Sequence, residues 1–577
     1  MEDWDKSTPL PDSSFTTYFG TNYAPSPQEV SDIQQLLVEP EKELKFLDEE
    51  FVRVYNQRIK LKTYIDNHRS LLSPIRRVPV DIIREIFAHC LPTLSLPTAN
   101  VKEAPLLLTR VCRSWREAAI TTPCLWNSVH VSLPSPQAPP ITDSYRLLIK
   151  TKSEGIQVWL GRSGSMPLRI SLQALVPSEL TIGPLSHIWE NDAQSLLELQ
   201  SLFSDFTKHL IAHASRWKSL GLNGSMATIQ LPEGLEELGS LEELKLCRQQ
   251  NDISRMSLEA IITRSPSLRV LHLENLPLEL PIRWSQLTEI QLGAHPLGFR
   301  LRPFDALEVL RLCPFLHDCT LGIGVDVNLA LETSSDIVLP CLAVLHVEFI
   351  PVTQPISFSL EMASQAQSLF DAIVAPMLKQ LSATAQCIPV ISPFTQGHHA
   401  LERLPFHTFV ERSKCCLDYL SLGFPVTANG ILRLLNLIPS LSKVTFRRSL
   451  FLYPMGPTEG LPEVIVALTP TDNRVLCPNL GVLICEECDP HWAKHLIALA
   501  EARSVGRPNE IGRLRAMVVT FRSFVEDAWV PMKLQLLRER GMVLHWTSPR
   551  DHRNQLLQSS QDRLSRYGVI SLGNHTY

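Results

Sequence analysis

The stretch LEAIITRSPSLRVLHL, residues 258–273, joins a helical segment to a strand through a proline turn. Its beginning, Leu258–Arg264, favours a helix. Ser265-Pro266 ends that helix, because a proline disfavours the helical conformation of the residue before it. The remainder has the alternating apolar positions of a half-buried strand. The same order of helix, proline turn and strand recurs at residues 431–446, so the chain uses this unit more than once.

A short pattern, Leu-x-x-Leu-x-Leu with apolar replacements, recurs nine times in the chain. Successive copies begin 19 to 39 residues apart. A single copy is a weak signal because the same letters occur in ordinary helices, but nine copies in series favour one strand per unit. The copies are SLEELKL (240–246), SLRVLHL (267–273), QLTEIQL (286–292), ALEVLRL (306–312), CLAVLHV (341–347), MLKQLSA (377–383), CLDYLSL (416–422), SLSKVTF (440–446) and NLGVLIC (479–485).

Serial units of this kind are typical of leucine-rich repeats. Each unit supplies a strand and a return segment, and it buries its apolar face only when neighbouring units stack on it. The asparagine that standard repeats carry at the inner turn is missing, so we expect residues 141–577 to form an irregular, leucine-rich-repeat-like solenoid. A helix at Lys533–Arg540, Gly541 and a last strand at Met542–Trp546 would cap it. An unrelated α/β domain is the alternative.

The segment before this domain contains a strand and a stiff joint. Ser128–Leu133 alternates in the manner of a strand, and LPSPQAPP, residues 133–140, is a proline-rich linker and the best candidate for a domain boundary. Beyond the joint, the pattern predicts strands at Gln157–Leu160 and Leu168–Leu172 and a helix at Ser201–Ser215.

Residues 73–132 carry two short apolar helices. SPIRRVPVDIIREIFAHCLP (73–92) predicts one helix, and PLLLTRVCRSWREAAITTPCLW (105–126) predicts a second that Thr121-Thr122-Pro123 ends. Helices this short cannot bury a core of their own, so a partner or the rest of the chain must cover their apolar side chains. A plain helical hairpin packed into a larger domain is one interpretation. The apolar positions are Ile82, Ile83, Ile86 and Phe87 in the first helix and Leu107, Leu108, Val111, Cys112, Trp115 and Ala119 in the second.

The order of residues in this segment resembles an F-box, in the form found in large families of fungal F-box proteins. The resemblance depends on Pro79, the Ile82–Phe87 stripe, Leu91-Pro92, Val111-Cys112-Arg113-x-Trp115 and Leu125-Trp126. The runs NYAPS (22–26), LLVEPEKEL (36–44) and IDNHRSLLSPIRR (65–77) are similar to the leader helix that precedes the F-box in these proteins. Two features depart from the family: Val78 stands where leucine is usual, and the loop Thr93–Ala104 is longer than in compact F-boxes.

The resemblance implies a non-enzymatic adaptor of a Skp–cullin–F-box ubiquitin ligase. In such a protein the F-box docks on the Skp-type adaptor, and the repeat domain binds a substrate protein, here unknown. One alternative is an interaction scaffold whose F-box-like segment no longer engages the ligase; another is an enzyme within Gln157–Trp546. The residues implied at the Skp-type contact are Pro79, Ile82, Ile83, Ile86, Phe87, Leu91, Val111, Cys112, Trp115, Leu125 and Trp126.

The N-terminal part predicts a disordered leader and a long helix. Residues 1–28 are polar and rich in proline, without periodicity. Residues 29–72 carry an apolar seam that Pro40, Arg58 and His68 interrupt. A coiled coil uses such a seam, so self-association through residues 37–72 is one interpretation; a single amphipathic helix that packs on its own domain is the other. The seam consists of Leu37, Leu44, Leu47, Phe51, Val54, Leu61, Ile65 and Leu72.

Composition and charge indicate which classes of partner and which cellular compartments are compatible with the sequence. The 577 residues carry a net charge of -5, which gives no support for nucleic-acid or anionic-membrane binding. The polar, acidic first residues differ from a signal peptide, and no apolar run reaches the length of a membrane span. Thirteen cysteines lie scattered at apolar positions and favour reduced core thiols. We therefore expect a protein of the cytoplasm or nucleus that is neither secreted nor membrane-bound.

The sequence offers no catalytic centre, no cofactor site and no metal site. Cys485 and Cys488, followed by His491 and His495, have the spacing of half a zinc site. A closed site needs four ligands, commonly from two separate clusters, and Cys485 falls where a repeat strand places a core residue. Phosphate-binding glycine loops, nucleophile elbows and kinase signatures are absent from the sequence.

Overall fold

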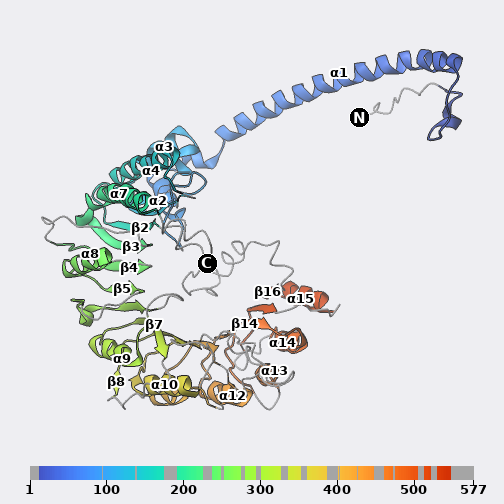
Figure 1. Cartoon of the computed structure of the whole chain (residues 1–577). Coiled ribbons are helices and arrows are strands. Elements are labelled where there is room, and N and C mark those ends of the chain that lie inside the picture. Colours follow the sequence, from blue (N-terminus) through green and yellow to red (C-terminus); the bar gives the residue numbers. More distant parts are fainter. Residues whose placement is uncertain are drawn as a thin grey trace. The chain divides into compact units, whose positions relative to one another are not determined.

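The structure is a computed structural model, shown in Figure 1, and the chain divides into two compact units, Met1–His89 and Cys90–Tyr577. The residues that the structure describes are 12–93, 95–134, 136, 139–174, 192–224, 237–247, 252–274, 280–293, 300–325, 336–351, 360–385, 401, 403–424, 426–447, 461–471, 475–504, 512–521 and 529–547.

Unit 1 is dominated by the predicted long helix, α1 (Pro27–Leu71). Its N-terminus is a capping box: the Ser26 hydroxyl accepts from the backbone N–H of Glu29, and the Glu29 carboxylate accepts from the backbone N–H of Ser26. Pro27 stands at the first turn, where a proline costs nothing. The unit also contains η1 (Thr16–Tyr18), η2 (Pro74–Arg77) and α2 (Val80–His89), and residues 1–11 of the predicted leader lie outside the described residues.

Unit 2 contains a parallel sheet of 14 strands that pair in the order in which they follow along the chain. Fold class is therefore mixed helix and sheet, with parallel rather than antiparallel pairing. A separate two-stranded sheet pairs β8 (Ile337–Val338) with β10 (Ile373–Val374). The strands of the large sheet are β1 (Ser128–Leu133), β2 (Leu168–Ala174), β3 (Trp217–Asn223), β4 (Glu243–Cys247), β5 (Val270–Leu273), β6 (Glu289–Leu292), β7 (Asp318–Val325), β9 (Val344–Pro351), β11 (Gln380–Ala385), β12 (Tyr419–Gly423), β13 (Lys443–Phe446), β14 (Val482–Cys488), β15 (Ala516–Phe521) and β16 (Val543–Thr547).

The strand register brings the leucines of the repeated pattern into one continuous apolar row. In SLRVLHL, for example, Leu271 pairs with Leu244 on one side and Ile290 on the other. Every member of the row is at most 7% exposed. The row therefore supplies much of the core: Val129, Ile170, Leu220, Leu244, Leu271, Ile290, Cys319, Leu345, Leu381, Leu420, Val444, Leu483, Met517 and Leu544.

Helices lie between many of the successive strands, as is usual where neighbouring strands are parallel. Between β5 and β6 the described residues contain only a 3-10 turn. In Figure 1 the helices from α8 to α15 lie on one side of the row of strands, and from α9 to α15 each helix contacts the next. The α-helices of unit 2 are α3 (Arg113–Ile120), α4 (Asp143–Arg162), α7 (Ala193–Ile211), α8 (Asp252–Thr263), α9 (Pro303–Leu312), α10 (Leu360–Asp371), α11 (His407–Ser413), α12 (Ala428–Leu437), α13 (Leu461–Leu468), α14 (Ala493–Ala502) and α15 (Val530–Glu539). Single 3-10 turns are η3 (Leu108–Arg110), η4 (Pro123–Leu125), η5 (Ala214–Arg216), η6 (Trp284–Gln286) and η8 (Pro490–Trp492).

Two predicted strands are helical, and the predictions were wrong there. Gln157–Leu160 belongs to α4, where Ile149, Ile156 and Leu160 are buried at helical spacing. ALEVLRL (306–312) belongs to α9, which Pro303 opens at its first turn. The strand of that unit is β7, in the glycine-containing run DCTLGIGV, which the leucine pattern does not mark.

The second short helix of the F-box-like segment is broken, which corrects the prediction of one continuous helix. Leu108 lies in η3, and α3 begins only at Arg113. Between them Cys112 adopts an extended conformation and caps α3, because its Sγ accepts from the backbone N–H of Trp115 at 3.4 Å. Cys112 is thus a helix cap rather than a member of a helical stripe.

Leu125 and Trp126 are fully buried within unit 2. The Trp126 indole N–H donates to the carbonyl of Ala119 at 2.8 Å, and its ring meets the ring of Trp159 edge to face, with 5.0 Å between centroids. The Arg162 guanidinium lies 4.5 Å from the centre of the same indole. These contacts tie the end of the F-box-like segment to α4.

Candidate functional site

The first candidate surface is one side of α2 in unit 1. Ile82 and Ile86 lie one helical turn apart and are 53% and 39% exposed, whereas Ile83 is 8% exposed and Phe87 is fully buried. Pro79 precedes the helix and is exposed as well. We call Pro79, Ile82 and Ile86 the α2 face. The sequence predicted all four residues of the stripe as partner contacts, and the structure divides them into a buried pair and an exposed pair.

The second candidate surface lies in unit 2, on η3 and the residues around Cys112. Leu107 and Val111 are 44% and 55% exposed, and Cys112 is exposed. Trp115 and Leu91 are half-buried. Of the residues implied at the Skp-type contact, unit 2 therefore leaves Val111 and Cys112 exposed to solvent and Leu91 and Trp115 half-buried. Leu125 and Trp126 are buried and cannot contact a partner directly.

The third candidate surface is the polar face of the sheet. Strand residues alternate between two faces, so the positions between the core leucines form a second row on the opposite face. Most members of this row are polar, and all are buried or half-buried. We call it the polar row: His130, Ser171, Gly221, Lys245, His272, Gln291, Thr320, His346, Ser382, Ser421, Thr445, Ile484, Val518 and His545.

Acidic groups gather around the polar row at β4–β7. The Glu243 carboxylate accepts from the Lys245 ammonium at 2.5 Å, and Glu289 Oε1 lies 2.8 Å from His272 Nε2. The hydrogen bond with His272 holds the pKa of Glu289 below its usual value. Burial, together with the charge of Glu289, raises the pKa of Asp318 to about 6. This part of the sheet can therefore accept hydrogen bonds and bind cationic groups.

Replacing Asp318 by asparagine is expected to stabilise the protein at neutral pH. Because its pKa is higher in the folded chain, the protonated carboxyl group contributes most to stability below about pH 4, and that contribution is lost as the pH rises through about 6 and the group ionises. Asp318→Asn should therefore raise the free energy of unfolding by about 1–2 kcal/mol at pH 7.5 and leave it nearly unchanged at pH 4. Urea unfolding at the two pH values measures the difference. Equal stabilisation at both pH values would contradict the burial of the carboxylate.

Cationic groups gather around the polar row at β12–β14 and the loop after β13. The Lys443 ammonium lies 4.6 Å from the centre of the Tyr419 ring, and burial, with the nearby charge of Arg447, lowers its pKa to about 8. The Arg447 guanidinium donates to the Ser421 hydroxyl at 3.2 Å and pairs with Glu486 at 3.3 Å. Burial, with the same arginine, lowers the pKa of His346 to about 4. Acidic side chains thus flank the polar row at β4–β7, where they pair with Lys245 and His272, and cationic side chains flank it at β12–β14.

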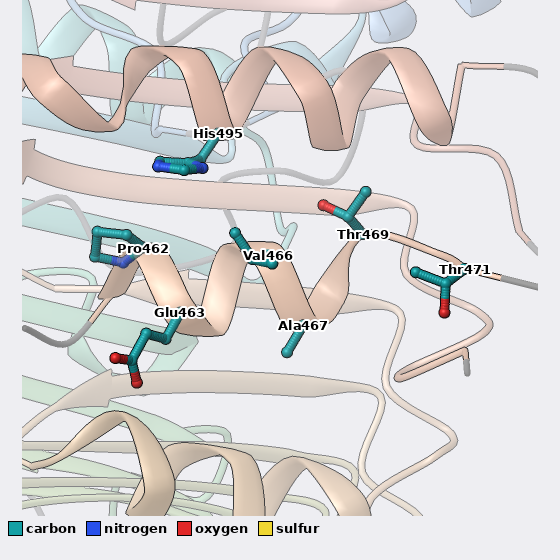
Figure 2. A pocket seen from close by; sticks show the side chains of 7 residues that line it. All are labelled: Pro462, Glu463, Val466, Ala467, Thr469, Thr471 and His495. Carbon is teal, nitrogen blue, oxygen red and sulfur yellow. The ribbon is translucent and has the colours of Figure 1, made fainter. Parts of the chain in front are cut away.

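A recess of about 510 Å³ lies between α13 and α14. Figure 2 shows its lining: Pro462, Glu463, Val466, Ala467, Thr469, Thr471 and His495. The Glu463 carboxylate points away from the His495 ring in that view, and burial lowers the pKa of His495. Among these seven lining residues no acid and base face each other as a catalytic pair would.

Cys485 and Cys488 are both fully buried in β14, as expected for core residues. Burial raises the pKa of the Cys485 thiol, which disfavours the thiolate that a metal needs. Within the part of the chain that the structure describes, no three histidine, cysteine or acidic side chains gather in an arrangement that could hold a metal ion.

The polar row and its charged neighbours were not singled out from the sequence. The signal was present for eight of the members, because each of these is the residue between the last two apolar positions of a Leu-x-x-Leu-x-Leu copy: Lys245, His272, Gln291, His346, Ser382, Ser421, Thr445 and Ile484. Among the described residues, no helix combines the length and the apolar character that a membrane span requires.

Compared with models of known protein families and with curated proteins, the chain gives no match.

Proposed function

We propose that the protein is a non-enzymatic, F-box-type substrate adaptor of a Skp–cullin–F-box ubiquitin ligase, acting in the cytoplasm or nucleus. The observation that carries the proposal is the α2 face. A short helix with the residue order of an F-box leaves two isoleucines exposed, although the neighbouring apolar pair is buried. Buried aliphatic anchors of this kind normally supply most of the binding energy of an interface.

The Skp-type adaptor would cover Pro79, Ile82 and Ile86 in unit 1. Burying one exposed isoleucine contributes about 1–2 kcal/mol, so two of them account for a substantial share of a micromolar affinity. In unit 2 the remaining candidates for adaptor contact are the exposed Val111 and Cys112 and the half-buried Leu91 and Trp115. Ile83, Phe87, Leu125 and Trp126 would act indirectly, as core residues.

The sheet and helices of unit 2 would form an irregular, leucine-rich-repeat-like solenoid. Three observations support this: the strands pair in chain order, one apolar row runs through all of them, and the helices from α8 to α15 lie on one side. The substrate protein would bind the polar row, whose flanking acidic groups at β4–β7 and cationic groups at β12–β14 favour a segment with charges of both signs. The substrate itself is not specified by these residues.

The test is co-purification of the full chain with a Skp-type adaptor, followed by addition of the cullin. Stable assembly of all three proteins is the expected result. An F-box-like scaffold that does not engage the ligase would stay separate from the adaptor, which would overturn the proposal. The departures Val78 and the long loop Thr93–Ala104 make this alternative the one to exclude.

A further inference from the structure

The helix α1 presents an apolar seam that the other described residues of unit 1 leave uncovered. No residue of its 45 is buried. Leu44, Leu47, Phe51 and Leu61 are between 56% and 70% exposed. Val30 and Ile33 continue the same spacing of seven toward the N-terminus, so the seam extends beyond the stretch that the sequence pattern first marked. An apolar seam about 60 Å long needs a partner of similar length.

The charges of α1 are divided between its two halves. Residues 27–50 carry eight acidic and two basic side chains, whereas residues 51–71 carry one acidic and five basic side chains. Few of these charges are neutralised within the helix; the ion pairs recorded along it join Lys42 to Glu39 at 2.6 Å and Arg53 to Glu50 at 2.7 Å. A helix with this polarity complements a second copy of itself that runs in the opposite direction.

A parallel pair would place like charges together. In parallel coiled coils each seam residue meets its own counterpart, so Arg58 would face Arg58 and His68 would face His68. On the flanks, Glu43 of one helix would lie beside Asp48 of the other, a like-charge contact. The parallel orientation is therefore disfavoured at three places along the helix.

We propose that α1 of one copy pairs with α1 of a second copy in antiparallel orientation, centred between Val52 and Arg53. In that register every interrupting residue of the seam meets an apolar or oppositely charged neighbour. Arg58 packs against Leu47 of the second copy and comes within reach of its Asp48. The layers, each occurring twice by symmetry, are Ile33 with Leu72, Leu37 with His68, Pro40 with Ile65, Leu44 with Leu61, Leu47 with Arg58, and Phe51 with Val54.

Both flanks of this arrangement are complementary. One flank places Glu41 opposite Arg69 and Asp48 opposite Lys62, with Tyr55 meeting its own counterpart at the centre. The other flank places Leu36 opposite Leu71, Glu43 opposite the Tyr64 hydroxyl and Glu50 opposite the Gln57 amide. No like-charged pair remains in contact, and opposite charges set both the orientation and the register. The pairing does not depend on the adaptor function proposed above.

Charge reversal at one flank position distinguishes the two orientations. In the antiparallel pair the lysine of Asp48→Lys would face Lys62 and Arg58 of the second copy, and the dimer affinity should fall by about tenfold. In a parallel pair the same lysine would face Glu43 of the second copy, and the dimer affinity should rise. Glu49→Lys is the matched control, because it makes the same change of charge on the side of the helix away from the seam. Mixing Asp48→Lys protein with Lys62→Asp protein should restore dimers, since each variant then supplies the charge that the other needs.

Sedimentation equilibrium of the full chain at low and high salt gives the readout. For the wild-type chain we expect a mass of twice 65.0 kDa and weaker association at high salt. Asp48→Lys protein alone should lose association, and its mixture with Lys62→Asp protein should form dimers again. A wild-type monomer at about 50 µM would overturn the proposal, since an interface of this length should hold at that concentration. Stronger association of Asp48→Lys than of Glu49→Lys would also overturn it, in favour of the parallel pair.

Discussion

Replacing Arg503 by methionine is expected to lower the free energy of unfolding by about 3–5 kcal/mol. Arg503 follows α14 and is fully buried. Its Nε donates to the carbonyl of Leu468 at 3.1 Å, Nη1 to that of Cys477 at 3.1 Å and Nη2 to that of Leu476 at 2.7 Å. These carbonyls belong to the end of α13 and to the segment that leads to β14. One guanidinium therefore holds the connection between α13 and β14 against the end of α14.

The methionine variant keeps the apolar stem but leaves three buried carbonyls without that donor. Lysine keeps the charge but presents a single ammonium, so Arg503→Lys should recover only part of the loss. Arg538→Met on α15, where the side chain is exposed, is the matched control and should change stability by less than about 0.5 kcal/mol. Urea unfolding followed by circular dichroism measures all three variants. Equal stability of Arg503→Met and Arg538→Met would contradict a structural role of the buried guanidinium.

Replacing Ile82 and Ile86 together by alanine is expected to weaken binding to a Skp-type adaptor by about 100-fold or more. Central aliphatic anchors of an interface typically cost about 2 kcal/mol each when truncated, and 1.4 kcal/mol corresponds to a factor of ten in affinity. Alanine favours the helix, so α2 should remain folded. Isothermal titration of the full-length variant with the adaptor measures the change.

A matched control separates loss of the α2 face from loss of exposed apolar surface in general. Leu147 on α4 and Leu536 on α15 are 64% and 44% exposed, which is close to the exposure of the two isoleucines. Leu147→Ala with Leu536→Ala should leave the affinity within about twofold, since neither residue lies near α2 in the sequence or belongs to the F-box-like segment. Equal losses in the two double variants would show that the α2 face has no special role.

The parallel sheet could be predicted because the leucines carry the register. In a strand of a parallel sheet the two leucines of L-x-L point to the same face, and stacking identical units aligns them. The same pattern gave a wrong strand prediction at residues 306–312, because Leu307 and Leu310 are also spaced to lie on one side of a helix. Local sequence alone cannot separate these outcomes; Pro303 and the packing of neighbouring units decide for α9.

The candidate sites were predictable only in part. The stripe Ile82–Phe87 identified α2, but periodicity does not tell which apolar residues the rest of the chain covers, and burial divided the stripe into Ile83 with Phe87 and Ile82 with Ile86. Cys112 matched the apolar spacing of a helix, yet the extended backbone there made it a cap. Nothing in the sequence around Arg503 distinguishes a buried arginine from a solvated one, because its partners are backbone carbonyls from a distant segment.

A titration of the purified full chain with a Skp-type adaptor tests the proposed function most directly. If the protein is an F-box-type adaptor, the wild-type chain and the Leu147/Leu536 control should bind with a Kd of about 1 µM or tighter, and the Ile82/Ile86 variant should bind about 100-fold more weakly. Circular dichroism confirms that each sample is folded. Failure of the folded wild-type chain to bind at about 100 µM adaptor would contradict the adaptor function and leave the α2 face without a role in a ligase.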